Sequence, residues 1–273
     1  MPTKTARRLY TCLAFALLVP AAPALAQYTP RSVSNPPSGE IYHIEGAIGF
    51  WFPTADIRIS SESIGIPGTD IDVKKDLGVV DQHFPEFHVT LRPARKHKFR
   101  FQLIPLSYEA QHTLTRTIVF NGQEYTIGIP VKSDLEWKAY RFGYEYDFVA
   151  RDWGFVGVIF EAKYTDVGAT LTSPYASEFA RAQGPIPAIG GIVRVYVVPS
   201  VSVTGELSGI DVPTIQDQYQ AHYTELNIYG TWNANRYIGA QFGYRLLNVG
   251  YMFKEDTGHF IVDGVHFGVV ARF

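Results

Sequence analysis

Two groups of acidic and histidine residues in this sequence have the residue types of a hydrolytic site. They are Asp70, Asp72, Asp81 and His83 in the first third of the chain, and Asp256, His259 and Asp263 near its end. Paired carboxylates beside a histidine can activate water or a nucleophile, as in hydrolases and proteases. Their spacing matches no catalytic motif, and the sequence has no His-Glu metalloprotease helix, no Gly-Xaa-Ser-Xaa-Gly elbow and no glycine-rich phosphate loop. We therefore expect no catalytic residues, no metal site and no cofactor, and a hydrolase is the least favoured function.

The first 26 residues have the pattern of a secretory signal peptide. Basic residues between Lys4 and Arg8 precede an apolar stretch from Leu9 to Val19, and small residues lead to Ala26. The apolar stretch is shorter than the roughly 20 residues that a membrane-spanning helix needs. We predict export through the periplasm, with cleavage after Ala26.

Cysteine content and charge exclude further classes of protein. The only cysteine, Cys12, lies in the predicted signal peptide, so the mature chain would have no disulfide, thiolate metal site or cysteine nucleophile. Without its first 26 residues the chain has 21 basic and 26 acidic residues, a formal charge of −5. A nucleic-acid partner is not expected from this balance.

From Glu40 onward, segments of alternating polar and apolar residues are separated by turn residues. In the clearest segment, residues 140–148, five aromatic residues alternate with Arg141, Gly143, Glu145 and Asp147. Ten such segments predict an all-β, transmembrane, antiparallel up-and-down β-barrel of about ten strands, with eight or twelve as alternatives. A soluble barrel would expose those aromatic residues to water without gain. We expect a signal peptide at residues 1–26, a flexible periplasmic tail at 27–39 and one barrel at 40–273.

Turn residues and aromatic residues predict the ends of the strands. The first strand is expected at residues 40–52, and residues 173–187 are expected to form a loop. The pair Asn121-Gly122 predicts a hairpin that joins the third and fourth strands and projects beyond the membrane. Among the aromatic residues, Trp51 and Trp137 are expected in the outer of two interfacial belts.

The alternation also predicts which charged side chains face the barrel interior. Seven are basic and seven are acidic: Arg92, Arg100, Arg141, Lys163, Arg194, Arg245 and Arg272, and Glu45, Glu86, Glu145, Asp147, Glu161, Glu206 and Glu225. Because an unpaired charge in a confined site is costly, we expect these side chains to pair across the lumen. A ten-stranded barrel is close to the size that side chains fill, so the predicted lumen is largely closed.

The end of the chain resembles the C-terminal strand of a bacterial outer-membrane β-barrel. Its apolar positions alternate with Gly264, His266, Gly268 and Arg272, and they are Val265, Phe267, Val269, Ala271 and Phe273. Such strands close the barrel and are read by the insertion machinery, so these five residues are the expected insertion signal. The resemblance implies a porin-like protein in the outer membrane of a Gram-negative bacterium. Its implied partners are outer-membrane lipids, lipopolysaccharide and the barrel-insertion machinery.

A second resemblance concerns the long first loop. Residues 68–79, Gly-Thr-Asp-Ile-Asp-Val-Lys-Lys-Asp-Leu-Gly-Val, are similar to a segment of an uncharacterised family of outer-membrane barrels, and the whole chain more loosely resembles small barrels of the hydrophobic-compound channel type. The family implies no catalytic residues. The loop has too many apolar residues to extend into water, so we expect Asp70, Asp72, Asp76 and Leu77 to belong to a segment that covers the barrel mouth, as a packing cap or as a lid.

The resulting expectation is a non-enzymatic barrel with a charge-paired, largely filled lumen and a structural or surface-interaction role. The alternative is a narrow channel, transporter or binder of small, hydrophobic molecules. The sequence names no ligand.

Overall fold

A computed structural model describes residues 37–61, 63, 65–215, 219–253 and 256–273. The predicted signal peptide, its cleavage site and residues 27–36 of the predicted tail lie outside these described residues. None of the described helices is long and apolar enough to cross a membrane.

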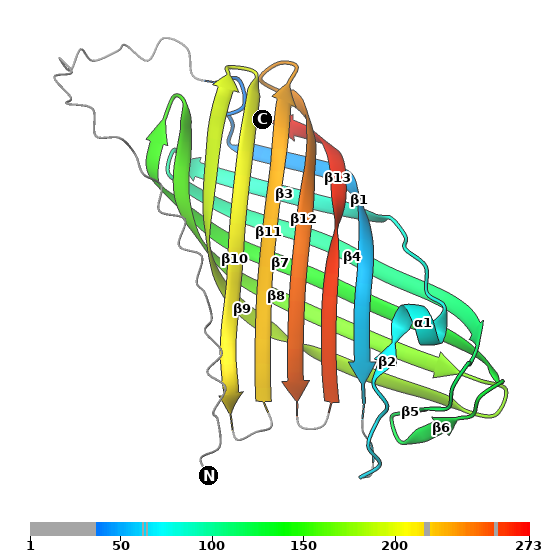
Figure 1. The fold of residues 1–273 in the computed structure, drawn as a ribbon. Coiled ribbons are helices and arrows are strands. Elements are labelled where there is room, and N and C mark those ends of the chain that lie inside the picture. Colours follow the sequence, from blue (N-terminus) through cyan, green and yellow to red (C-terminus); the bar gives the residue numbers. More distant parts are fainter. Residues whose placement is uncertain (1–36, 62, 64, 216–218, 254–255) are drawn as a thin grey trace, which may run out of the picture. The chain divides into compact units, whose positions relative to one another are not determined.

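Ten long antiparallel strands form a closed barrel, as the alternation predicts (Figure 1). They are β1 (Ile44–Ser60), β3 (Phe84–Ala94), β4 (His97–Thr113), β7 (Pro130–Arg151), β8 (Gly154–Thr172), β9 (Ser177–Val198), β10 (Val201–Ile215), β11 (Tyr219–Asn233), β12 (Ile238–Phe253) and β13 (Asp256–Arg272). Strands β1 and β13 close the sheet in a register that runs from Glu45 opposite Arg272 to Ser60 opposite Thr257. The predicted ten-stranded, all-β barrel is confirmed.

The outer surface of the barrel carries a band of exposed apolar side chains. Phe142 on β7, Phe160 on β8 and Phe242 on β12 expose 57, 51 and 64% of their surface. On β7 the outward face changes at Lys138 and Glu136, which are charged and exposed. Apolar exposure on this scale is unfavourable in water and suits the hydrocarbon of a bilayer, so the charged residues mark the outer edge of the membrane band.

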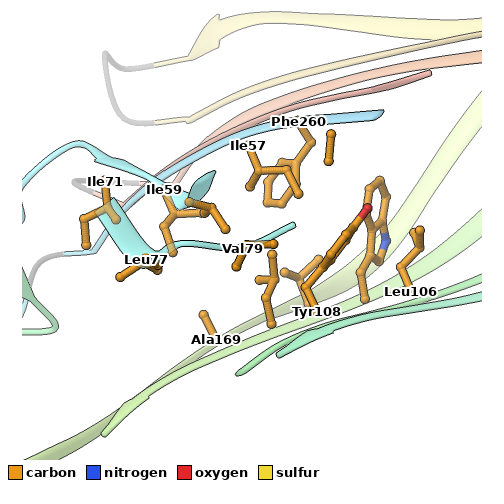
Figure 2. Packing of buried hydrophobic residues seen from close by; sticks show 14 of the residues in the cluster. Ile57, Ile59, Ile71, Leu77, Val79, Leu106, Tyr108, Ala169 and Phe260 are labelled. Carbon is orange, nitrogen blue, oxygen red and sulfur yellow. The ribbon is translucent and has the colours of Figure 1, made fainter. Parts of the chain in front are cut away.

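Four short elements lie at the end of the barrel away from the C-terminus (Figure 1). We call this end the outer mouth and the four elements the cap. They are β2 (Ile71–Asp72), α1 (Val73–Leu77), β5 (Ile118–Phe120) and β6 (Gln123–Tyr125). The Asp72 side chain accepts a hydrogen bond from the Lys75 backbone N–H at the start of α1, and Gly78 ends the helix in the left-handed region with φ of 70°. Leu77 and Val79 pack with barrel residues such as Ile57 and Tyr108 (Figure 2).

Three expectations about local structure are wrong. Asn121 and Gly122 do form a tight turn, with φ of 50° and 78°, but it belongs to the separate β5–β6 hairpin, because β4 ends at Thr113 and β7 begins at Pro130. Strand β1 continues through Pro53 to Ser60, beyond the expected end of the first strand at residue 52. Residues 177–187, expected in a loop, form the first half of β9.

Trp51 and Trp137 are also misplaced by the sequence interpretation. Both point into the barrel and are almost completely buried, with 0 and 4% of their surface exposed. Trp51 alternates with the exposed Phe50 and Phe52, and its indole N–H donates to the Gly264 carbonyl. Aromatic type suggested the membrane interface, whereas the period of two places these side chains inside.

Candidate functional site

The periplasmic half of the barrel interior is filled by charged side chains. The structure places each of the fourteen predicted lumen residues in an ion pair inside the barrel. Two further residues take part in these pairs. Glu40 pairs with Arg92 and Arg194, and Lys98 pairs with Glu145 and Asp147. Inward charges recur on most of the strands because each contributes every second residue to the lumen. The ion pairs therefore join strands that are distant in the sequence.

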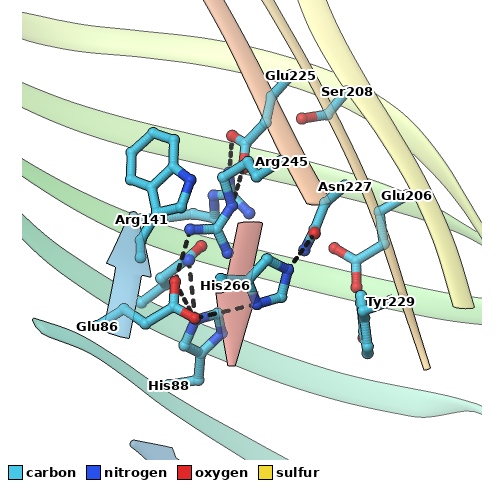
Figure 3. Close-up of polar contacts among 12 residues, drawn as sticks. Glu86, His88, Arg141, Glu206, Ser208, Glu225, Asn227, Tyr229, Arg245 and His266 are labelled. Carbon is cyan, nitrogen blue, oxygen red and sulfur yellow. Dashed lines mark hydrogen bonds and ion pairs between the residues drawn. The ribbon is translucent and has the colours of Figure 1, made fainter. Parts of the chain in front are cut away.

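One cluster lies in the middle of the barrel (Figure 3). Glu225 on β11 accepts a hydrogen bond from Arg141 on β7, and its carboxylate lies 3.2 Å from the Lys163 ammonium and 3.5 Å from Arg245 Nε. Arg245 also donates to Glu86 on β3 at 2.6 Å, and its guanidinium stacks over the Trp51 ring. The cluster ties β3, β7, β8, β11 and β12 together across the lumen.

A second cluster lies closer to the periplasmic end. The Lys98 ammonium is 2.6 Å from Glu145 and 2.9 Å from Asp147, and all three side chains are almost fully buried. Arg100 Nη2 donates to both carboxylate oxygens of Glu206 at 2.8 Å. A single arginine nitrogen thus bridges the carboxylate, and such charge-assisted hydrogen bonds are stronger than neutral ones.

Glu40 closes the periplasmic end, and sequence reasoning did not include it among the lumen residues. Its carboxylate accepts hydrogen bonds from Arg92 at 2.9 Å, Arg194 at 3.3 Å and Tyr196 at 2.9 Å. Lys98 was missed as well, although its alternation with the exposed Phe99 was a sufficient signal. The first strand was expected to begin at Glu40, whereas β1 begins at Ile44, so Glu40 lies before the part of the chain in which the alternation applies.

Little space remains between these charged side chains. The hollow lined by Glu86, Arg100, Arg141 and Glu206 has a volume of about 40 Å³, room for a water molecule or two. Among the described residues, the charged half of the lumen is therefore filled.

The outer half of the interior is apolar and hollow. A cavity of about 610 Å³ lies there, within the range of small-molecule sites. Its walls include Trp137, Val167, Ala169, Val249 and Phe260, all buried. The cavity is partly open to the outside, and its largely apolar wall suits an apolar molecule.

Trp137, one residue of the cavity wall, keeps its indole N–H away from the open space. Its Nε1 is buried and donates to no group in the described part of the chain. An unmade hydrogen bond at a buried donor costs about 1–3 kcal/mol. Trp137 therefore offers a molecule in the cavity its apolar ring and not its N–H.

The cap covers the outer mouth, and the four residues singled out in the first loop lie in or beside it. Leu77 is buried in the apolar cluster, and Asp72 caps α1. Asp76 accepts hydrogen bonds from the Arg116 guanidinium at 2.8 and 2.6 Å, and this pairing lowers the pKa of its carboxyl group. Asp70 is exposed, and its backbone carbonyl accepts from Arg116 at 2.6 Å.

The aspartate and histidine residues that could form a hydrolytic site have separate contacts in the structure. Asp81 accepts from the Ala55 backbone N–H and pairs with Lys74 at 2.7 Å, while His83 stacks on Phe52. His259 lies on the outer face of β13 opposite Arg58 of β1. Among the described residues, no three histidine, aspartate or glutamate side chains form a group that could hold a metal ion.

The C-terminal strand pairs with both neighbours along its length. Val265, Phe267 and Val269 expose 41, 48 and 54% of their surface on the lipid side, and Ala271 is half-buried. Phe273 is 76% exposed, while its backbone N–H and carbonyl bond to Ile44 of β1. The alternation of the expected insertion signal is therefore present in the folded barrel.

Comparisons with known proteins connect this architecture with one class. No family model and no curated protein matches the chain. The outer membrane protease OmpT from Escherichia coli has a similar fold, with a TM-score of 0.53 and 6% identity over 84% of this chain and 96% of that one. The Pseudomonas putida toluene transporter TodX (TM-score 0.37, 10% identity, 88 and 93% coverage) and Ail of Yersinia pestis (0.37, 8%, 85 and 99%) are more distant matches.

The likeness to OmpT shows the fold and carries no activity across. With the closed ten-stranded sheet and the exposed apolar band, it shows that this chain has the fold of bacterial outer-membrane β-barrels.

Proposed function

We propose that this protein binds a small apolar molecule in the outer half of its barrel and does not conduct solutes through the barrel. The carrying observation is the cavity of about 610 Å³ lined by apolar side chains above a filled, ion-paired lumen. The wall includes the buried side chains of Trp137, Val167 and Phe260, so the favoured ligand is apolar. The protein acts without catalysis, in contact with outer-membrane lipids and lipopolysaccharide.

The cavity supports binding over transport because the two halves of the lumen differ in free space. A solute leaving the cavity toward the periplasm would have to separate the Arg141–Glu225 and Arg245–Glu86 pairs. Separating buried, hydrogen-bonded charges costs several kcal/mol. We therefore expect purified protein in planar bilayers to give no reproducible single-channel steps.

Binding is tested with N-phenyl-1-naphthylamine, an apolar fluorescent amine, and the Ala182→Phe variant. Ala182 lines the cavity from β9, so a phenyl ring there occupies the space and should weaken probe binding at least about tenfold. Ala162→Phe is the matched control, because Ala162 lies exposed on the lipid side of β8. Equal probe binding by the wild type and both variants would contradict the proposal and leave a structural role.

A Trp137→Phe variant tests how this wall residue acts. It keeps an aromatic ring and removes an N–H that is buried away from the cavity, so affinity should change equally for ligands with an acceptor group and for pure hydrocarbons. A fall confined to ligands with an acceptor group would show that the N–H reaches the bound molecule.

A further inference from the structure

The barrel wall is incomplete between β9 and β10 in its outer half. The two strands pair from Val201 opposite Val198 to Gly209 opposite Ile189, with a bulge at the start. Beyond this point β9 continues outward from Ala188 to Ser177 and pairs with β8 alone, while β10 continues to Ile215 and pairs with β11. In Figure 1 the two strands run together at one end and separate toward the other.

The apolar cavity reaches this gap. Its lining includes residues 180–186 of β9 and Val212 of β10, the two strands on either side of the gap. Arg181 and Gln183, on the outward face of β9, are among these lining residues. The cavity therefore lies directly behind the unpaired stretch of the wall.

The sequence prevents the missing rungs from forming. The Tyr196 N–H donates to the Trp153 carbonyl, and the β8–β9 register then runs without a shift. Backbone groups of even-numbered β9 residues therefore point toward β8, and those of Pro185 and Pro187 point toward β10. Extending the β9–β10 register places Pro213 opposite Pro185 and Asp211 opposite Pro187.

The pairs Pro187–Asp211 and Pro185–Pro213 would be the next two hydrogen-bonded pairs of the β9–β10 ladder. Each such pair exchanges two N–H···O bonds. Proline has no N–H, so the pair of Pro185 with Pro213 can form neither bond, and the pair of Pro187 with Asp211 can form only one. The prolines also reduce the number of unpaired donors at an edge that faces lipid, where such donors are costly.

The gap lies at the outer boundary of the membrane band. The outward side chains of β9 change from Ile189, Pro187 and Pro185 to Gln183 and Arg181 as the strand leaves the band. His222 of β11 also lines this side of the cavity. A molecule in the gap would have apolar walls toward the interior and polar groups at the rim.

The cap covers the outer mouth of the barrel, so the gap between β9 and β10 is the route into the cavity from the side. The Asn121 side chain of the β5–β6 turn donates to Glu178 and to the Phe179 carbonyl on β9, at 3.1 and 3.4 Å. The Tyr125 hydroxyl donates to the Leu171 carbonyl on β8 at 3.0 Å. The hairpin is thus fastened across the mouth, while the charged clusters fill the lumen below.

We infer that the gap between β9 and β10 is a lateral port through which the acyl chain of an outer-leaflet amphiphile enters the cavity, with its polar head held at the rim near Arg181, Gln183 and His222. This inference rests on the proposed function and names the ligand class and its route. An acyl chain suits the apolar interior, and a polar head suits the rim.

The test uses tryptophan fluorescence in vesicles of phosphatidylcholine with brominated acyl chains, because bromine quenches tryptophan on contact. Trp153→Phe and Trp232→Phe remove the two exposed tryptophans and leave Trp51 and Trp137 inside the barrel. Cys12→Ser removes the only cysteine, which lies outside the described residues. Quenching in this background reports chains that enter the interior.

Two pairs of introduced cysteines then test the port: one pair closes it with a disulfide, and the other is a control that leaves it open. Pro187→Cys with Asp211→Cys places a disulfide across the first open rungs, and Val193→Cys with Gly205→Cys places one where the ladder is already complete. Oxidation of the first pair should abolish quenching, reduction should restore it, and the second pair should show quenching in both states. A variant with Pro185, Pro187 and Pro213 all changed to valine should also reduce quenching, because it restores the ladder donors.

Quenching that is absent in the reduced protein, or unchanged by the Pro187–Asp211 disulfide, would overturn the lateral port. N-phenyl-1-naphthylamine binding separates this result from failure of the proposed function. Binding of that probe by the oxidised protein would show that the cavity takes ligands by another route, whereas no binding in either state would remove the binding function itself.

Discussion

The inward side chains of the barrel change character halfway along the strands. On β8, Glu161 and Lys163 are followed by the buried Val167 and Ala169, and on β12 Arg245 is followed by Leu247. The charged half leaves about 40 Å³ of space and the apolar half about 610 Å³, within the same ring of strands. Long charged side chains reach across the lumen to their partners, whereas the small residues on β9 leave the space above them open.

The difference shows how one barrel can be closed and hollow at once. Charge pairing decides where the lumen is filled, and the absence of long inward side chains decides where it is not. The barrel wall shows the same division. Around the charged half β9 pairs with both β8 and β10, whereas around the cavity it pairs with β8 alone.

The largest expected effect comes from breaking a buried pair in the charged half. Glu206 accepts two hydrogen bonds from Arg100 Nη2 and a third from the Tyr229 hydroxyl at 2.8 Å. Glu206→Gln removes the nearer of the two carboxylates that pair with Arg100, the other being Glu145 at 3.3 Å, so the free energy of unfolding in vesicles should fall by about 3 kcal/mol. Urea titration followed by tryptophan fluorescence measures it, and a loss below about 1 kcal/mol would show that the charged half is solvated.

A smaller loss is expected in the apolar half. Val249 is buried and lines the cavity, so Val249→Ala removes two carbon atoms beside space that already exists. We expect the free energy of unfolding to fall by about 1–2 kcal/mol. The same titration serves, and a cost equal to that of Glu206→Gln would remove the distinction between the two halves.

The cap provides a prediction that depends on pH. The hydrogen bonds from Arg116 lower the pKa of Asp76, so its stabilisation is present above the pKa of about 3.9 of an unfolded aspartate and is lost as pH falls through the lowered folded value. Asp76→Asn should destabilise the cap by about 1 kcal/mol at neutral pH and remove this pH dependence. Hydrogen exchange at the Lys75 and Gly78 amides reports it, and identical exchange in wild type and variant at neutral pH would show that the pair does not hold the cap.

The smallest effect is expected for an arginine–carboxylate pair that is exposed to water. Arg181 donates to both carboxylate oxygens of Asp166 at 2.8 and 2.6 Å, on exposed parts of β9 and β8. Asp166→Asn should change the free energy of unfolding by less than about 1 kcal/mol. Arg181 uses two nitrogens in a fork, a better geometry than the single nitrogen of Arg100 on Glu206, so an effect as large as that of Glu206→Gln would show that burial is not what separates the two pairs.

Alternation was sufficient to predict the strand count, because a period of two assigns each side chain to a face. The structure places the fourteen charged residues that it assigned to the lumen in ion pairs inside the barrel. Alternation failed where the inward and outward residues of a strand do not differ in polarity. The outer half of β9 consists largely of alanine, glycine and proline and was interpreted as a loop. Trp51 and Trp137 were assigned by their type, although their positions in the alternation place them inside.

The cavity and the gap depend on distances between strands that a single sequence does not state. Once the β9–β10 register is known, the prolines at 185, 187 and 213 explain why the ladder stops. The cap was recognised from its excess of apolar residues, but its helix α1, five residues long, is too short to produce a periodic signal.

The division of the lumen is tested most directly by a crystal structure of the protein under xenon pressure, because xenon occupies apolar cavities and avoids polar ones. The account predicts xenon beside Trp137, Val167 and Ala182 in the outer half, and none among Arg141, Glu225 and Arg245. Xenon among the charged side chains, or an outer half that takes up none, would contradict it.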